Sequence, residues 1–194
     1  MSLEEVDWSR IPPPADDGGA DHLAGMALPA LALPATDGRP VDLSALAGRS
    51  VVYIYPMTGR PDVPLPGGWD MIPGARGCTP QSCAFRDHFA DLRRLGVDNL
   101  FGLSVQDTGY QREAAERLHL PFALLSDAGM ALAEALRLPR LQVAGMRLLK
   151  RLTLVIDSGQ ITRAFYPVFP PDAHVGELAA WLRENPPAGH APGV

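Results

Sequence analysis

The spacing of apolar residues changes along the chain from an uninterrupted run to a helical repeat, and this change predicts a strand followed by a helix. The run SVVYIYP at residues 50–56 is β-branched and aromatic with almost no polar interruption, the pattern of a strand covered on both faces. From residue 79 to residue 95 the apolar positions instead recur at helical spacing, with Phe85, Phe89 and Leu92 on one face. A buried strand therefore precedes an amphipathic helix.

The rest of the chain continues this alternation as far as residue 185. Strands are expected at 99–105, 122–127, 151–157 and 161–168, and helices at 109–120, 130–138 and 174–185. Two shorter strands are expected on either side of the Thr-Asp-Gly turn at 36–38. Alternating strands and helices indicate an α/β fold with a layered sheet, which here closes on an antiparallel pair.

Composition divides the chain into a central domain and three less regular segments. Its 194 residues, 46% of them hydrophobic, suit one compact domain with a sizeable core, which we place at 23–185. Residues 1–22 are rich in proline, glycine and aspartate, so we expect a flexible N-terminal arm with Trp8 docked. Residues 186–194 are expected to form a flexible tail. The proline- and glycine-rich stretch 57–77 is a long loop, of a kind that is uncommon unless it serves a function.

Charge and hydropathy argue against two classes of partner. The chain has 17 basic and 22 acidic residues, and its arginines form no run that would follow a phosphate backbone, so no nucleic acid is expected. The apolar stretch from Leu23 is interrupted by Pro29 and Pro34 and is shorter than the about 20 residues that a bilayer requires. Neither membrane insertion nor export is expected.

Cys78 and Cys83 are the only cysteines in the chain. A close pair of thiols in a chain of this size fits a reducing compartment, which predicts a cytoplasmic location and a catalytic or metal-binding role. A metal site is not expected, because no second pair of cysteines or histidines lies nearby to complete a tetrahedron.

The position of Cys78 at the expected start of a helix favours a reactive thiolate. Unpaired backbone N–H groups and the positive end of the helix dipole stabilise negative charge there, and Gly77 allows a ligand to approach the backbone closely. The alternative is an inert buried cysteine that acts as a small hydrophobe. Cys83 lies about 140° around a regular helix from Cys78 and roughly 7.5 Å along its axis. Disulfides need Cα atoms within about 7 Å, so the pair can bridge only if the first turns unwind.

Five segments resemble the peroxiredoxin family, and within it the peroxiredoxin Q or bacterioferritin-comigratory-protein branch. They are YIYP at 53–56, GCTPQSCAFRDHFADLRRLGV at 77–97, FGLSVQ at 101–106, LPFALLSD at 120–127 and KRLTLVIDSGQI at 150–161. They occur in the family's order, and the resemblance extends over about residues 25–185. It implies a thioredoxin-like fold, with a central mixed sheet and helices on both faces, and a thiol peroxidase acting on hydrogen peroxide and organic hydroperoxides.

The resemblance also implies roles for individual residues. Cys78 would be the peroxidatic thiolate, Cys83 the resolving thiol, and Arg151 the guanidinium that holds the thiolate and the peroxide oxygens. Arg147 and Lys150 lie near enough in sequence to compete for that last role. The sulfenic acid on Cys78 would condense with Cys83, and thioredoxin or another dithiol protein would reduce the disulfide, with no metal or organic cofactor. The preferred peroxide, and the choice between a monomer and a homodimer, stay open.

One part of the family's motif is missing from its usual place. In most members the cysteine ends the motif Pro-x-x-x-Thr/Ser-x-x-Cys. Here Met71 stands in the proline place and Ala75 in the threonine place. Pro56 and Thr58 instead stand at the end of the first central strand, separated from Cys78 by an apparent insertion at about 59–77. Either Thr58 folds back to supply the missing hydroxyl or no hydroxyl is supplied; we favour Thr58.

Two further questions concern function. The same cysteine pair would also suit a redox-sensing thioredoxin-fold module that uses it as a switch, whereas a disulfide reductase is disfavoured because Cys-x-x-Cys is absent. The insertion is interpreted as a lid or wall beside Cys78, with an apolar inner side formed by Trp69, Val63, Leu65 and Met71. The alternative is a surface loop or a subunit contact anchored by Trp69.

Overall fold

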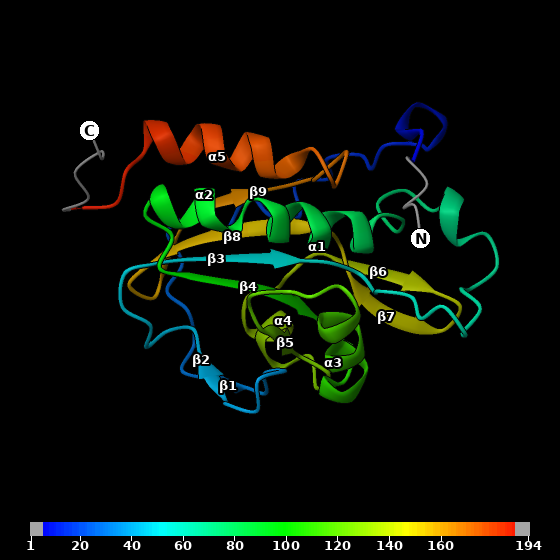
Figure 1. Cartoon of the computed structure of the whole chain (residues 1–194), viewed down its shortest axis with the longest axis horizontal. Coiled ribbons are helices and arrows are strands. Elements are labelled where there is room, and N and C mark those ends of the chain that lie inside the picture. Colours follow the sequence, from blue (N-terminus) through cyan, green and yellow to red (C-terminus); the bar gives the residue numbers. More distant parts are fainter. Residues whose placement is uncertain (1–5, 189–194) are drawn as a thin grey trace.

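A five-stranded mixed sheet lies at the centre of the protein (Figure 1). The computed structural model describes residues 6–188, and the strand order of this sheet is β5-β4-β3-β8-β9. Strands β3, β4 and β5 are parallel, whereas β8 is antiparallel to β3 and β9 to β8. Their bounds are β3 Arg49–Ile54, β4 Asn99–Ser104, β5 Leu124–Ser126, β8 Leu152–Asp157 and β9 Gln160–Phe165. The predicted mixed sheet and its antiparallel closing pair are confirmed.

Strand β3 is buried on both faces, as its uninterrupted apolar sequence predicts. Alternate side chains enter different cores: Tyr53 joins the apolar cluster on one face, and Val52 and Ile54 join the cluster on the other. Helices therefore cover both faces. The helices are α1 Cys78–Asp87, α2 Phe89–Arg94, α3 Thr108–Arg117, α4 Ala131–Ala135 and α5 His174–Glu184.

Helices α1, α2 and α5 lie together on the Tyr53 face (Figure 1). Phe85 of α1, Leu92 of α2 and Leu178 of α5 are fully buried there. Leu132 and Leu136 belong to the opposite cluster, so α4 covers the other face together with apolar residues that precede β3. No helix within residues 6–188 is long and apolar enough to cross a membrane.

The helix expected from residue 79 to residue 95 is divided at His88. Helix α1 ends at Asp87 and α2 begins at Phe89, while His88 has φ −100° and ψ 9°. The His88 ring nitrogen Nδ1 lies 3.0 Å from the Ala84 carbonyl oxygen, which the His88 backbone N–H also approaches. The prediction of a single helix was therefore wrong, although the apolar face on which it was based continues through both helices.

Two hairpins lie outside the central sheet. Strands β1 (Ala32–Leu33) and β2 (Val41–Asp42) pair antiparallel about the predicted turn. Strands β6 (Arg140–Val143) and β7 (Met146–Leu149) form a second antiparallel pair, which the sequence analysis missed. In Figure 1 this second hairpin projects from the end of the molecule where α1 begins.

The described part of the N-terminal arm lies against the domain. Residues Trp8–Arg10 form a 3₁₀ turn, and the Trp8 indole Nε1 donates a hydrogen bond to Asp172 Oδ2 at 2.8 Å, so the docking of Trp8 is confirmed. Ile11 and Ala20 are buried. The flexibility expected of residues 1–22 and 186–194 stays a prediction, and residues 1–5 and 189–194 lie outside the described range.

Candidate active site

Cys78 is the first residue of α1, where the sequence places a reactive thiol. Its neighbour Gly77 caps the helix with φ 104°, a left-handed conformation that glycine adopts without strain. The Cys78 side chain is only 3% exposed. As a thiol, its Sγ donates to the Ala75 carbonyl oxygen at 3.6 Å. Local sequence therefore determines where this sulfur lies, at the positive end of the helix.

Arg151, immediately before β8, brings a fixed positive charge to Cys78. Its Nη2 donates to Cys78 Sγ at 3.2 Å, and its Nη1 bonds the Gln81 side-chain oxygen. The same Nη2 lies 3.1 Å from the Arg76 carbonyl and 3.2 Å from the Ala75 carbonyl. A buried guanidinium held by this many acceptors is oriented before any ligand arrives.

The two competing cations have other positions. Lys150 Nζ forms an ion pair with Asp17 at 2.5 Å, and Arg147 is exposed on β7. Of the three candidates, only Arg151 contacts the Cys78 sulfur among the described residues. This choice depended on contacts between distant segments, so sequence alone left it open.

Thr58 is buried but is not in hydrogen-bond contact with Cys78. Its hydroxyl donates to the Gln106 side-chain oxygen at 3.2 Å, and its backbone N–H donates to the same oxygen at 2.9 Å. The Gln106 amide returns a hydrogen bond to the Thr58 carbonyl at 3.0 Å. In this conformation Thr58 does not supply the missing hydroxyl, because Gln106 holds it. Pro56 is buried at the end of the strand, as expected.

A pocket of about 340 Å³ opens beside Cys78. Its walls come from four parts of the chain: the N-terminal arm, the residues after β3, the insertion, and the start of α1. The residues that line it are Val6, Met57, Gly59, Leu65, Trp69, Asp70, Arg76, Gly77, Cys78, Thr79 and Pro80. An ion pair of 3.2 Å joins Asp70 and Arg76 within this wall. The insertion therefore borders the candidate active site.

The insertion is anchored differently from the way the sequence suggested. Trp69 is buried with Ala75, Val143 and Leu148, so it packs against the β6–β7 hairpin. The other apolar residues expected on an inner side are exposed: Val63 by 45%, Leu65 by 42% and Met71 by 59%. Leu65 nevertheless lines the pocket beside Cys78 together with Trp69, whereas Val63 and Met71 do not, so the expected apolar inner side was wrong for Val63 and Met71.

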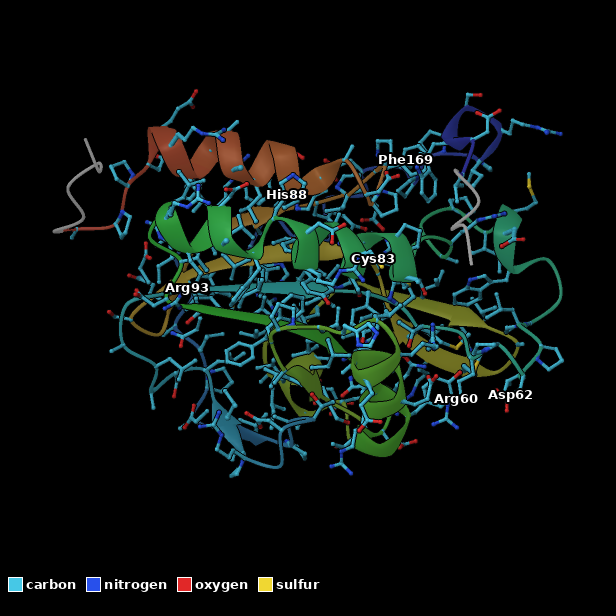
Figure 2. All side chains as sticks on the ribbon, viewed as in Figure 1. Arg60, Asp62, Cys83, His88, Arg93 and Phe169 are labelled. Carbon is cyan, nitrogen blue, oxygen red and sulfur yellow. The ribbon has the colours of Figure 1, made fainter. Side chains whose placement is uncertain are left out.

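Cys83 lies in the second turn of α1 (Figure 2), and both cysteines are free and buried. Burial raises the pKa of the Cys83 thiol, although the positive charges of Arg86 and Arg117 oppose this shift. Helix α1 is continuous from Cys78 to Asp87. A bond between the two sulfurs therefore requires α1 to open locally.

A buried aromatic stack joins α1 to strand β3. Tyr53 stacks on Phe85 with ring centroids 4.4 Å apart, and the Tyr53 hydroxyl donates to Ser82 Oγ at 3.1 Å. Burial raises the pKa of Tyr53 well above its usual value, so the phenol is neutral near pH 7. Sequence reasoning missed Gln81, Gln106 and Tyr53 as neighbours of the site, although all three lie inside the quoted segments.

A metal centre finds no support in the described part of the chain. Within residues 6–188, no group of three or more His, Cys, Asp or Glu side chains is placed to hold a metal ion.

The family model described as Redoxin matches residues 23–182, more than half of the chain. The chain belongs to the Redoxin family.

Two of the curated proteins whose sequences are similar to this chain are named peroxiredoxin Q, chloroplastic. The protein from Oryza sativa subsp. japonica is 34% identical over 161 residues, covering 82% of this chain and 66% of that protein. The protein from Arabidopsis thaliana is 30% identical with the same coverage. This Redoxin chain thus spans slightly less than two thirds of the length of these relatives.

Solved structures agree with this membership. Peroxidoxin BcpB from Mycobacterium tuberculosis has a TM-score of 0.66 and 26% identity, covering 84% of this chain and 97% of that one. Peroxiredoxin Q from Xanthomonas campestris has a TM-score of 0.65 and 24% identity, covering 84% and 98%. The thioredoxin-like fold and the resemblance to peroxiredoxin Q are therefore confirmed, and with them the expectation of a peroxiredoxin.

The predicted cytoplasmic location is wrong by the same comparison. The curated relatives named above are chloroplastic proteins. The prediction relied on a low number of cysteines, which separates reducing from oxidising compartments but does not distinguish one reducing compartment from another.

Proposed function

We propose that this Redoxin-family protein is a thiol peroxidase that reduces hydrogen peroxide and organic hydroperoxides, with Cys78 as the peroxidatic residue. The observation that carries the proposal is the position of Cys78 Sγ, at the start of α1 and 3.2 Å from Arg151 Nη2, beside an open pocket. The names of the relatives support the same activity.

The first step is attack of the Cys78 thiolate on the distal oxygen of the peroxide. The S–O bond forms as the O–O bond breaks, the other oxygen leaves as water or an alcohol after protonation, and Cys78 becomes a sulfenic acid. Arg151 presents N–H donors fixed by the Gln81 side chain and by backbone carbonyls. Donors held in this way stabilise the charge that develops on the cleaving oxygens without first having to reorganise.

The second step joins the two cysteines. The Cys83 thiol attacks the Cys78 sulfenic acid, a disulfide forms and water leaves. A dithiol protein of the thioredoxin type then reduces the disulfide by thiol–disulfide exchange. Because both sulfurs lie on one continuous helix, the step includes local opening of α1.

The lining of the pocket supports organic hydroperoxides as substrates. Met57, Leu65 and Trp69 form part of the wall beside Cys78. Apolar side chains at this position favour a substrate that carries an alkyl or aryl group next to its peroxide.

Mass spectrometry after one equivalent of peroxide tests the proposal. The wild-type protein is expected to lose two hydrogens in a crosslink between Cys78 and Cys83. Cys83→Ser is expected to stop at a sulfenic acid, which a sulfenic-acid-specific reagent will trap on Cys78. Cys78→Ser is expected to consume no peroxide.

Steady-state turnover with a thioredoxin system completes the test. The wild-type protein should consume peroxide repeatedly, whereas a redox-sensing switch would oxidise once and stop. Equal residual turnover in Cys78→Ser and Cys83→Ser would contradict the assignment of the two roles.

A further inference from the structure

The N-terminal arm packs against the backbone where α1 begins. A Cβ atom placed on Gly77 would lie 2.6 Å from Trp8 Cη2 and 2.4 Å from Pro171 Cγ, far closer than atoms can approach without a shift. Gly77 is the cap residue immediately before Cys78. The indole of Trp8 and the ring of Pro171 thus enclose the point from which the catalytic helix would unwind.

Trp8 is itself held in place by the segment that leads into α5. Its Nε1 donates to Asp172 Oδ2 at 2.8 Å, and its ring meets Phe169 edge to face at 5.8 Å between centroids. Figure 2 shows Phe169 next to the N-terminal segment. Asp7 closes the turn by accepting a hydrogen bond from the Ser9 N–H. The arm is therefore fixed against the domain on one side and against Gly77 on the other.

We propose that Trp8 is a positioning residue that holds the start of α1 in its helical form and thereby sets the fate of the Cys78 sulfenic acid. The inference rests on the proposed peroxidase function. Contacts between Trp8 and Gly77 exist only while the first turn of α1 is in place, so they stabilise the helical form relative to the opened one.

The sulfenic acid has two competing fates that depend on this equilibrium. In the helical form it stays beside Arg151, where a second peroxide oxidises it: R–SOH and R′OOH give the sulfinic acid R–SO₂H and the alcohol R′OH. In the opened form the Cys83 thiol reaches it, giving the disulfide and water. A contact that favours the helical form slows resolution and gives the second peroxide more time.

Opening confined to the turn around Cys83 would leave Trp8 out of the process. Tyr53 bonds Ser82, next to Cys83, and would hold that turn of the helix. Opening from Gly77 must break the Trp8 contact, whereas opening confined to the turn around Cys83 need not. The two routes therefore predict different effects of removing the indole.

The test is a single turnover of full-length Trp8→Ala with one equivalent of hydroperoxide. Sulfenic acid and disulfide formation are followed separately by quenching and mass spectrometry. Disulfide formation is expected to be about tenfold faster than in the wild type, the factor that corresponds to about 1.4 kcal/mol. The peroxide concentration that converts half of Cys78 to sulfinic acid should rise by the same factor. Trp8→Phe, which keeps a ring but loses the N–H, should lie between the two.

Trp181→Ala is the matched control. Trp181 lies in α5 and packs on Phe165, 6.1 Å between centroids, so its removal is expected to leave the ratio of disulfide to sulfinic acid unchanged. If Trp8→Ala fails to fold, Asp172→Ala removes only the acceptor of the indole and should shift the ratio in the same direction by a smaller factor.

The possible outcomes distinguish failure of the role proposed for Trp8 from failure of the proposed peroxidase function. A wild-type protein that forms neither sulfenic acid nor disulfide contradicts the peroxidase proposal. A wild-type protein that forms both, with an unchanged or slower disulfide step in Trp8→Ala, overturns the role of Trp8 alone.

Discussion

The surroundings of Cys78 and Cys83 differ although the two residues share one helix and are both almost fully buried. Cys78 has the helix start, a charged donor and a pocket. Cys83 lies within the helix, where burial raises the pKa of its thiol and favours the protonated form. In the proposed mechanism Cys78 attacks the peroxide and Cys83 resolves the sulfenic acid, and the different surroundings of the two thiols would account for these different roles.

Removing the guanidinium should have the largest effect, because it takes away the charged donor that contacts the Cys78 sulfur. Arg151→Met is expected to slow sulfenic acid formation by about 10²–10³-fold, the usual cost of losing a fixed donor at a site of developing charge. Arg147→Met, which removes an exposed arginine from the same chain region, is the control and should change the rate less than about twofold. Stopped-flow measurement of the first oxidation step checks both; comparable rates for the two variants would show that Arg151 does not act on Cys78.

Truncating Trp69 should alter the pocket of Cys78 and leave Cys83 untouched. Trp69 lines that pocket and packs on the β6–β7 hairpin, so Trp69→Ala is expected to raise the KM for a bulky hydroperoxide about tenfold more than the KM for hydrogen peroxide. The rate of disulfide formation after oxidation should stay the same. Parallel changes of KM for both substrates would assign the insertion a structural role only.

The smallest expected effect is on stability and concerns Cys83. Its pKa in the folded protein is raised above the unfolded value of about 8.5. The stabilisation from this thiol is therefore complete below about pH 8.5 and is lost as pH rises through the folded pKa. Denaturant unfolding of the reduced protein should show a steeper loss of unfolding free energy from pH 8 to pH 10 than Cys83→Ser does. Identical pH profiles would mean that Cys83 is solvated in the folded protein.

Features with a local cause were predictable from sequence. The continuous apolar run of β3 and the glycine and proline around Cys78 determine their structure within a few residues. The β6–β7 hairpin was missed because its turn places Ala144 at φ 48° and Gly145 at φ 80°, and alanine carries none of the Asn-Gly signal of such turns. An alanine in the left-handed region is imposed by the surrounding pairs and not by its own preference.

Features that depend on distant contacts were not predictable from local pattern alone. The bond from Thr58 to Gln106 joins residues 48 positions apart and was not foreseen. The contact from Arg151 to Cys78 joins residues 73 apart, and it was expected only through the family resemblance, with Arg147 and Lys150 as competitors. The Thr58 hydroxyl, expected to turn toward Cys78, donates instead to the Gln106 side-chain oxygen. Which acceptor a buried hydroxyl takes depends on the packing of the whole site, and a motif records only the residue type.

The carbonyls that hold Arg151 carry a consequence for how this site can evolve. Those of Ala75 and Arg76 belong to the main chain, and any amino acid at these positions would offer the same oxygen. Selection can therefore tolerate changes of side chain in this stretch as long as they fit, with the tightest limit at the fully buried Ala75. A site whose geometry is encoded in the main chain can lose its family motif by drift while it keeps its guanidinium in place. Homologous sequences are then expected to vary more freely at the half-buried position 76 than at position 75.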